Sequence, residues 1–422
     1  MQFEREKYLS ELIAGRNNGL VKIITGVRRC GKSFLLFTIW HDWLLAHDVD
    51  GNHIIEIQLD DFSNRHLRKP EALLDYVNSK LCRDGKTTYI ILDEVQLVDD
   101  FVEVILSLTH IRNVDVYVSG SNSRFLSSDV VTEFRGRGDE IRIWPLTFAE
   151  FFNGVGGDIH NAWKDYYTFG GLPQVALLET ETKKVDYLRG LYETTYLRDV
   201  IERNHLRNPE GMRELVRVLA SAIGAPTNVS RITNTFLSSQ GLSIKRATVS
   251  QYIDYLRDAF LIEEALRYDV KGRKYIGSET KYYFSDMGIR AAVLNFRQQE
   301  ENHIMENIIY NELRSRGYNV DVGLVEIGGK DKNGKFVRQQ LEVDFVVNRP
   351  PYRFYIQSAF RMSTPEKETQ ERRPLLSIND HFRKIIVVGD DIHRKEDEVG
   401  VMTIGVLEFL TDKKLLEQEF LR

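Results

Sequence analysis

Residues 26–33 read Gly26-Val27-Arg28-Arg29-Cys30-Gly31-Lys32-Ser33 and match every fixed position of the phosphate-loop pattern GxxxxGK[ST]. The apolar run at 20–25 predicts a buried strand that enters this loop, and residues 34–40 predict a helix that leaves it. Glycines let backbone N–H groups turn inward around an anion, and a helix N-terminus favours negative charge. The segment therefore predicts a phosphate-binding loop between a strand and a helix.

The polar residues of this loop have expected roles in holding ATP and its magnesium ion. Lys32 is expected to reach the β- and γ-phosphates, and the Ser33 hydroxyl is expected to ligate Mg²⁺. A glycine turn with a surface lysine is the alternative, which the flanking strand and helix disfavour. The residues expected to contact the nucleotide are Gly26, Val27, Arg28, Arg29, Cys30, Gly31, Lys32, Ser33 and Phe34.

A second signal lies at residues 89–94, where the apolar run Tyr-Ile-Ile-Leu ends in Asp93 and Glu94. Asp93 is expected to hold Mg²⁺ through water, at the carboxyl end of a strand near the phosphate loop. Glu94 is expected to polarise the attacking water as a general base. An acidic pair at a strand end is by itself often a solvated turn. Beside a complete phosphate loop, the pair favours hydrolysis over simple binding.

Two further residues are candidates for the catalytic step. Asn122, in the Ser/Asn cluster that follows the apolar strand at 114–118, could contact the γ-phosphate or the attacking water. A turn formed by these residues is an equal alternative. Arg137, flanked by glycines, could reach the developing phosphate charge from the same or a neighbouring subunit. An exposed loop arginine is the alternative there.

The overall composition sets limits on the class of protein. A chain of 422 residues is long enough for two or three domains, and its 42% hydrophobic and 28% charged residues are ordinary for a globular protein. The net charge of −5 gives no global attraction to nucleic acid. Two cysteines argue against a disulfide scaffold. Without a signal core or an apolar run of about 20 residues, we expect a cytoplasmic protein that does not enter a membrane.

Apolar strand-like runs alternate with helical stretches over residues 1–155, which predicts an α/β domain with a parallel sheet. Together, several motifs make the chain resemble a bacterial and archaeal family of AAA-type ATPases. These motifs are GVRRCGKS, YIILDEVQ, VSGSNSRFL, GRG, PLTFAEFF, GGLPQV, EVDFVV and YIQSAF. The resemblance covers nearly the whole chain. It implies a P-loop NTPase domain at 1–155, a helical lid and winged-helix region at 156–295, and a domain at 296–422 related to PD-(D/E)XK nucleases.

The middle region contains three helical stretches, at 215–223, 230–239 and 244–258, followed by two strand-like runs. This order predicts a winged helix. Lys245, Arg246 and Gln251 lie at the start of its candidate recognition helix, where residues that contact DNA belong. Winged helices also dock proteins, so the partner is left open between duplex DNA and a protein.

In the C-terminal region, the resemblance to PD-(D/E)XK nucleases can be checked residue by residue. Glu306 and Asp344 match the helix glutamate and the first-strand acid of that pattern. Gln357 and Ala359 stand where a second carboxylate and a lysine belong. A neutral amide binds Mg²⁺ less well than a carboxylate. The sequence therefore predicts a degenerate nuclease site at Glu306, Asp344 and Gln357 that serves binding or assembly.

These observations predict a switch that hydrolyses ATP with Mg²⁺ and recognises duplex DNA or a protein through its C-terminal half. The alternatives are an ATP-dependent DNA nuclease and a nucleotide-dependent binding module that does not hydrolyse ATP. A homo-oligomer is also left open, because Arg137 could act within or between subunits.

Overall fold

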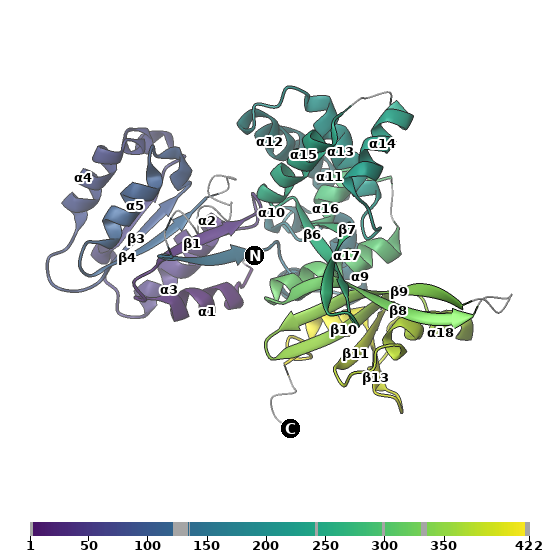
Figure 1. Ribbon diagram of the computed structural model, residues 1–422. Coiled ribbons are helices and arrows are strands. Elements are labelled where there is room, and N and C mark those ends of the chain that lie inside the picture. The colour runs from purple at the N-terminus through teal and green to yellow at the C-terminus, as the bar shows by residue number, and fades with distance from the viewer. Residues whose placement is uncertain are drawn as a thin grey trace. The chain divides into compact units, whose positions relative to one another are not determined.

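The computed structural model describes residues 3–120, 134, 136–240, 244–297, 300–330 and 336–417. The chain forms two compact units. Unit 1 comprises Met1–Pro145 and Asp258–Phe260, and unit 2 comprises Leu146–Arg257 and Leu261–Arg422 (Figure 1). The chain therefore passes from one unit to the other at three positions.

Unit 1 is built on a sheet of five strands in the order β2-β3-β4-β1-β5. All neighbouring pairs are parallel, as predicted from the alternation of apolar strands and helices. The central strands are buried along their length because helices cover both faces of the sheet. The strands are β1 (Val21–Gly26), β2 (Ile54–Gln58), β3 (Thr88–Asp93), β4 (Val114–Ser119) and β5 (Gly138–Ile143).

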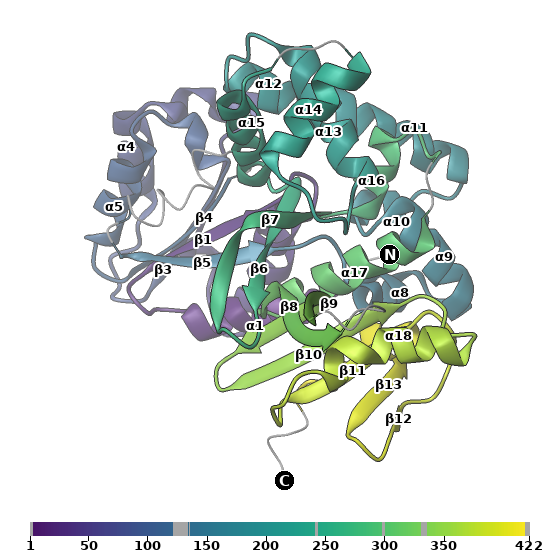
Figure 2. The same cartoon turned by 45° about the vertical axis from the view of Figure 1, so that its right-hand side comes forward.

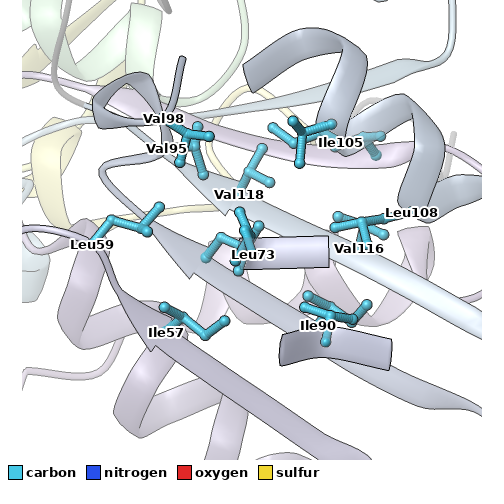
Figure 3. Packing of buried hydrophobic residues seen from close by; sticks show 14 of the residues in the cluster. Ile57, Leu59, Leu73, Ile90, Val95, Val98, Ile105, Leu108, Val116 and Val118 are labelled. Atoms are coloured by element: carbon cyan, nitrogen blue, oxygen red, sulfur yellow. The ribbon is translucent and has the colours of Figure 1, made fainter. Parts of the chain in front are cut away.

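The helices of unit 1 separate by the face of the sheet that they cover. Ile90 and Val118 point to one face, where they pack in a hydrophobic cluster with Leu73 and Leu108 (Figure 3). Tyr89 and Tyr117, one position earlier on the same strands, contact the ring of Trp40. Successive strand side chains point to opposite faces, so Trp40 lies on the other face. The elements are α1 (Glu6–Gly15), α2 (Lys32–Phe34), the π-helical η1 (Leu35–Trp40), α3 (His41–Ala46), α4 (Pro70–Lys80) and α5 (Phe101–Thr109).

A short segment from late in the sequence also belongs to unit 1. The Arg142 guanidinium carbon lies 4.3 Å from the ring centre of Trp144 and 4.3 Å from that of Phe260. A cation between two aromatic faces is attracted to both rings. This stack fixes the turn that contains Phe260 to the end of β5.

Unit 2 begins with helices. None of the described helices of either unit is both long and apolar enough to cross a membrane. The elements before the C-terminal region are α8 (Phe148–Val155), α9 (Ile159–Phe169), α10 (Pro173–Ala176), α11 (Glu181–Leu191), η5 (Tyr192–Leu197), α12 (Arg198–Arg203), α13 (Pro209–Ser221), α14 (Val229–Gln240), α15 (Arg246–Asp258) and α16 (Met287–Val293).

One mixed sheet of eight strands, in the order β12-β13-β11-β10-β9-β8-β6-β7, runs through unit 2. The hairpin of β6 (Ile262–Asp269) and β7 (Lys274–Phe284) joins it through parallel pairing of β6 with β8 (Asn319–Lys330) (Figure 2). The sheet thus unites residues on both sides of position 295. The other elements are α17 (Glu301–Ser315), β9 (Phe336–Arg349), β10 (Tyr352–Ala359), α18 (Pro365–Leu376), β11 (Arg383–Val388), β12 (Lys395–Glu396), β13 (Val401–Gly405) and α19 (Val406–Thr411).

The Gly-Gly turn of the GGLPQV motif is fastened to the start of α16. Asp286 accepts hydrogen bonds from the backbone N–H groups of Gly171, at 2.7 Å, and Ile289, at 3.0 Å. A Cβ at Gly170, whose φ is +78°, would lie 2.2 Å from the Asp286 carboxylate. Burial raises the pKa of Asp286 to about 6, against the lowering effect of these N–H groups. The motif therefore has a structural role in unit 2, because Asp286 joins its Gly-Gly turn to the start of α16.

Unit 1 buries an ion pair inside its sheet. Lys22 on β1 is fully buried, and its ammonium group contacts the carboxylate of Asp115 on β4. Asp115 also accepts hydrogen bonds from the Tyr117 hydroxyl, at 2.8 Å, and the Asn17 backbone N–H, at 2.9 Å. Burial lowers the pKa of Lys22, and Asp115 opposes this effect. Each charge is therefore tolerated because the other is present.

Replacing Lys22 by Met should lower the free energy of unfolding of unit 1 by about 3–5 kcal/mol, because it leaves a buried carboxylate unpaired. The double variant Lys22→Met/Asp115→Asn should recover part of this loss, since it removes both charges. Urea denaturation followed by the fluorescence of Trp40 and Trp43 measures both values. Equal destabilisation in the single and double variants would contradict the pairing argument.

Candidate nucleotide-binding site

The phosphate loop lies between β1 and α2, as its sequence predicts, and two of its glycines are sterically required. Gly26 has φ +137°, and a Cβ there would lie 2.2 Å from the Ile143 carbonyl oxygen on β5. Gly31 has φ +103°, in a region that favours glycine. The Cys30 thiol is buried and lies 3.6 Å from the same Ile143 oxygen. The loop is thus held against the end of β5.

Lys32 is folded over this loop. Its Nζ donates to the carbonyl oxygens of Gly26, at 2.9 Å, and Val27, at 3.1 Å. The side chain is buried, so its charge stays close to the backbone of the loop. This is the position from which an ammonium group can meet a phosphate held by the loop N–H groups.

Asp93 and Ser33 meet at the carboxyl edge of the sheet. Asp93 is the last residue of β3, is buried, and accepts a hydrogen bond from the Ser119 hydroxyl, while the Ser33 hydroxyl lies close enough to interact with it. Burial raises the pKa of Asp93, and the nearby carboxylates of Glu94 and Asp60 add to this effect. A bound divalent cation would offset both the burial of the Asp93 charge and its repulsion by Glu94 and Asp60. Carboxylate and hydroxyl oxygens are the ligands that Mg²⁺ prefers. These residues therefore fit a magnesium site.

Glu94 follows directly, in an uncommon backbone conformation. Its φ is +54°, in the left-handed region where residues other than glycine are rare. Its N–H donates to the Asp93 carboxylate at 3.1 Å, and its own carboxylate accepts a hydrogen bond from the Gln96 amide. The side chain of Glu94 is therefore oriented by local contacts beside the candidate magnesium ligand.

Two residues of this edge were not singled out from the sequence. Ser119 ends β4, the strand between β3 and β1, and its hydroxyl donates to Asp93. Asp60 follows β2, and its charge acts on Asp93. The only signal in the sequence was one polar residue at or just after the end of each apolar strand. Such a residue becomes informative only once the order shows that β2 and β4 are the neighbours of β3. Asn122, which was singled out, lies outside the described residues.

Arg137 lies at the opposite edge of the sheet. Its carbonyl accepts a hydrogen bond from the N–H of Val21, at the start of β1, and its guanidinium lies 3.1 Å from a His110 ring nitrogen. The phosphate loop follows the other end of β1, about 16 Å away at 3.3 Å per residue. An arginine side chain does not span that distance, so Arg137 does not serve the loop of its own chain.

The other predicted site residues lie in unit 2. Glu306 on α17, Asp344 on β9 and Gln357 on β10 line one cavity. Lys245 and Arg246 are exposed at the start of α15, and Gln251 on that helix is exposed and donates to the Tyr255 hydroxyl at 2.6 Å.

Two family models match parts of the chain. Residues 18–152 match a family described as an AAA domain, and residues 160–300 match a domain of unknown function, DUF8612. A Walker-type ATPase of Pyrococcus abyssi superposes with a TM-score of 0.49 at 15% identity, over 69% of this chain and 96% of its own.

Two relatives match by sequence. An uncharacterized protein of Methanocaldococcus jannaschii is 26% identical over 78% of this chain and 72% of its own length. An uncharacterized protein of Haemophilus influenzae is 30% identical over 96% of this chain and 98% of its own length. The chain thus belongs to one family with the Haemophilus influenzae protein, and it carries an AAA domain at residues 18–152.

Proposed function

We propose that unit 1 hydrolyses ATP with Mg²⁺ and that the resulting change of nucleotide acts as a switch for unit 2. The observation that carries this proposal is the position of the buried Asp93 carboxylate, at the carboxyl end of β3 and close enough to the Ser33 hydroxyl of the phosphate loop to interact with it. These two residues lie on elements separated by β4, and they bring together the two oxygen types expected around Mg²⁺.

Each residue of the edge then has a chemical role. The loop N–H groups and Lys32 hold the phosphates, while Ser33 and Asp93 hold the metal ion. Bound Mg²⁺ neutralises charge on the β- and γ-phosphate oxygens. Glu94 accepts a proton from the water that attacks the γ-phosphorus. A binding module would not need this base, so Glu94 favours hydrolysis.

Replacing Lys32 by Ala should lower ATP turnover by about 100-fold or more, because one preorganised charge on the phosphates is lost. Phosphate release at saturating Mg²⁺ measures this change. Lys86→Ala, which removes an exposed lysine of the same unit, should leave turnover unchanged. Full turnover in Lys32→Ala would place hydrolysis elsewhere in the chain or in a contaminant.

Replacing Glu94 by Gln should slow turnover by about 10²–10⁴-fold, while ATP affinity changes little, because only the proton acceptor is removed. Equilibrium binding of a fluorescent ATP analogue separates the two effects. Glu103→Gln on the exposed side of α5 is the matched control. Saturable binding without phosphate release in the unmodified protein would instead support the non-hydrolysing module.

Replacing Arg137 by Ala should leave the affinity for ATP within about twofold, because Arg137 pairs with the start of β1, about 16 Å along that strand from the phosphate loop. Turnover measured over a dilution series then tests a role between subunits. Loss of turnover only at concentrations where the unmodified protein self-associates would assign Arg137 to a neighbour's site. A concentration-independent loss of ATP affinity would contradict the strand register.

We further propose duplex DNA as the partner of unit 2. Lys245 and Arg246 place two exposed positive charges at the start of α15, the last of the three helices that precede the β6–β7 hairpin. Positive charges at the start of a helix are suited to phosphate contacts beside a groove. In the hairpin turn, Lys271 instead donates to the Glu326 carbonyl at 2.8 Å, which ties the turn to β8. The proposal of a DNA contact therefore rests on α15 and not on the turn of the β6–β7 hairpin.

The double variant Lys245→Ala/Arg246→Ala should weaken duplex binding and reduce the slope of log affinity against log salt by about 2. Fluorescence anisotropy over a salt series gives both quantities. Lys164→Ala/Lys183→Ala removes the same charge from exposed positions on α9 and α11 and should change neither. Equal effects in the two double variants would show that duplex binding depends only on the net charge of the protein. No duplex binding at low salt would favour a protein partner.

A further inference from the structure

Unit 2 contains a cavity of about 880 Å³ that the proposed ATP chemistry does not use. Its wall is formed by the first turns of α17, the end of β10, and α18. The acidic residues on that wall are Glu300, Glu301, Glu306, Asp344 and Glu371. Such a collection of acids requires a cation or protons to balance its charge.

The cation is supplied from the β6–β7 hairpin. Lys281 on β7 is only 2% exposed. Its Nζ lies 2.8 Å from a Glu306 oxygen, 2.8 Å from a Glu342 oxygen and 3.7 Å from an Asp344 oxygen. One ammonium group therefore faces three carboxyl groups from α17 and β9. Tyr283, also on β7, donates its hydroxyl to Glu306 at 2.7 Å.

The surrounding contacts hold these carboxyl groups in place. Asp344 accepts a hydrogen bond from the Ser358 N–H at 2.8 Å. Gln357 donates from its side-chain amide to Glu371 at 3.1 Å, so a neutral group separates Glu371 from Asp344. His303 lies 3.8 Å from the second Glu306 oxygen, and Lys367 lies 2.6 Å from Glu371. Arg361, Glu300 and Glu301 are the other charged residues on the cavity wall.

The electrostatics agree with this geometry. Burial alone would raise the pKa of Glu306, but the charge of Lys281 and the hydrogen bonds to the carboxylate bring it to about 2. Burial tends to lower the pKa of Lys281, and its three carboxyl neighbours more than reverse this effect. Burial, followed by the charge of Glu306, raises the pKa of Asp344. The stable charge pair is therefore Lys281 with Glu306.

We propose that Lys281 is the resident cation of the acidic cluster beside this cavity and that its ammonium group excludes a divalent metal ion from among Glu306, Glu342 and Asp344. A metal ion at that position would stand within a few ångströms of a buried positive charge and would compete with the Lys281 ammonium group for the same carboxylate oxygens.

This assignment has a functional consequence for unit 2. A nuclease of the PD-(D/E)XK kind needs a metal ion to activate water beside the phosphodiester. With Lys281 in the metal's place and Gln357 and Ala359 at the positions of a carboxylate and a lysine, the cavity lacks the parts for that step. The same ion pairs fasten the hairpin to α17 and β9, so the acids serve assembly of the sheet.

Binding of Mn²⁺ tests the proposal, with the full chain carrying Asp93→Asn to silence the candidate magnesium site of unit 1. In this background the protein should bind no Mn²⁺ at the cavity, and adding Asp344→Asn should change nothing. Lys281→Met should gain one Mn²⁺ site, detected by the loss of the free-Mn²⁺ electron paramagnetic resonance signal. Lys281→Arg, which keeps the charge, should gain none.

The gained site should disappear again in Lys281→Met/Asp344→Asn. Mn²⁺ should also raise the melting temperature of Lys281→Met but not that of Lys281→Arg. Folded Lys281→Met without a new site would overturn the proposal. If Lys281→Met does not fold, the Asp93→Asn protein alone decides. Mn²⁺ binding by this protein that is lost on adding Asp344→Asn would contradict the proposal, and the absence of such binding would support it.

Discussion

The parallel direction of the five strands in unit 1 is the constraint on which the candidate site depends. Because all five carboxyl ends face one edge, residues distant in sequence are gathered there without a dedicated binding loop for each. Ser33, Asp93 and Ser119 meet in this way, each at the end of a different strand or of the loop that follows it. The same rule places Arg137, which precedes a strand, at the opposite edge.

What could be predicted from the sequence was local. The phosphate loop and the acidic end of β3 are contiguous patterns in which residue type and spacing carry the chemistry, so both were found together with the parallel sheet. Ser119 and Asp60 were not found, because each is one polar residue whose importance depends on which strands are neighbours. The placement of Arg137 depends likewise on the pairing of β5 with β1. Strand order is set by long-range packing, and no local pattern reports it.

Unit 2 shows the same limit on a larger scale. Its helices, the hairpin and the C-terminal strands each have a periodic pattern, but the pairing of β6 with β8 joins segments about 55 residues apart, between partners such as Arg267 and Val322. That pairing brings Lys281 close to the acidic side chains beside the cavity. Only in this setting can Gln357 be recognised as the neutral residue between Glu371 and Asp344. The Gly170-Gly171 turn similarly acquires its role only through Asp286, more than a hundred residues later.

The stack of Arg142 between Trp144 and Phe260 makes unit 1 discontinuous in sequence. A chain ending at Pro145 would keep the whole five-stranded sheet and the phosphate loop, yet it would expose one face of Arg142 where Phe260 belongs. The ring-covered end of β5 is also the end whose Ile143 carbonyl abuts the loop at Gly26. Excising unit 1 by a single cut after Pro145 therefore removes Phe260, which packs on Arg142 beside the phosphate loop, and a minimal fragment that keeps this contact must retain residues 258–260.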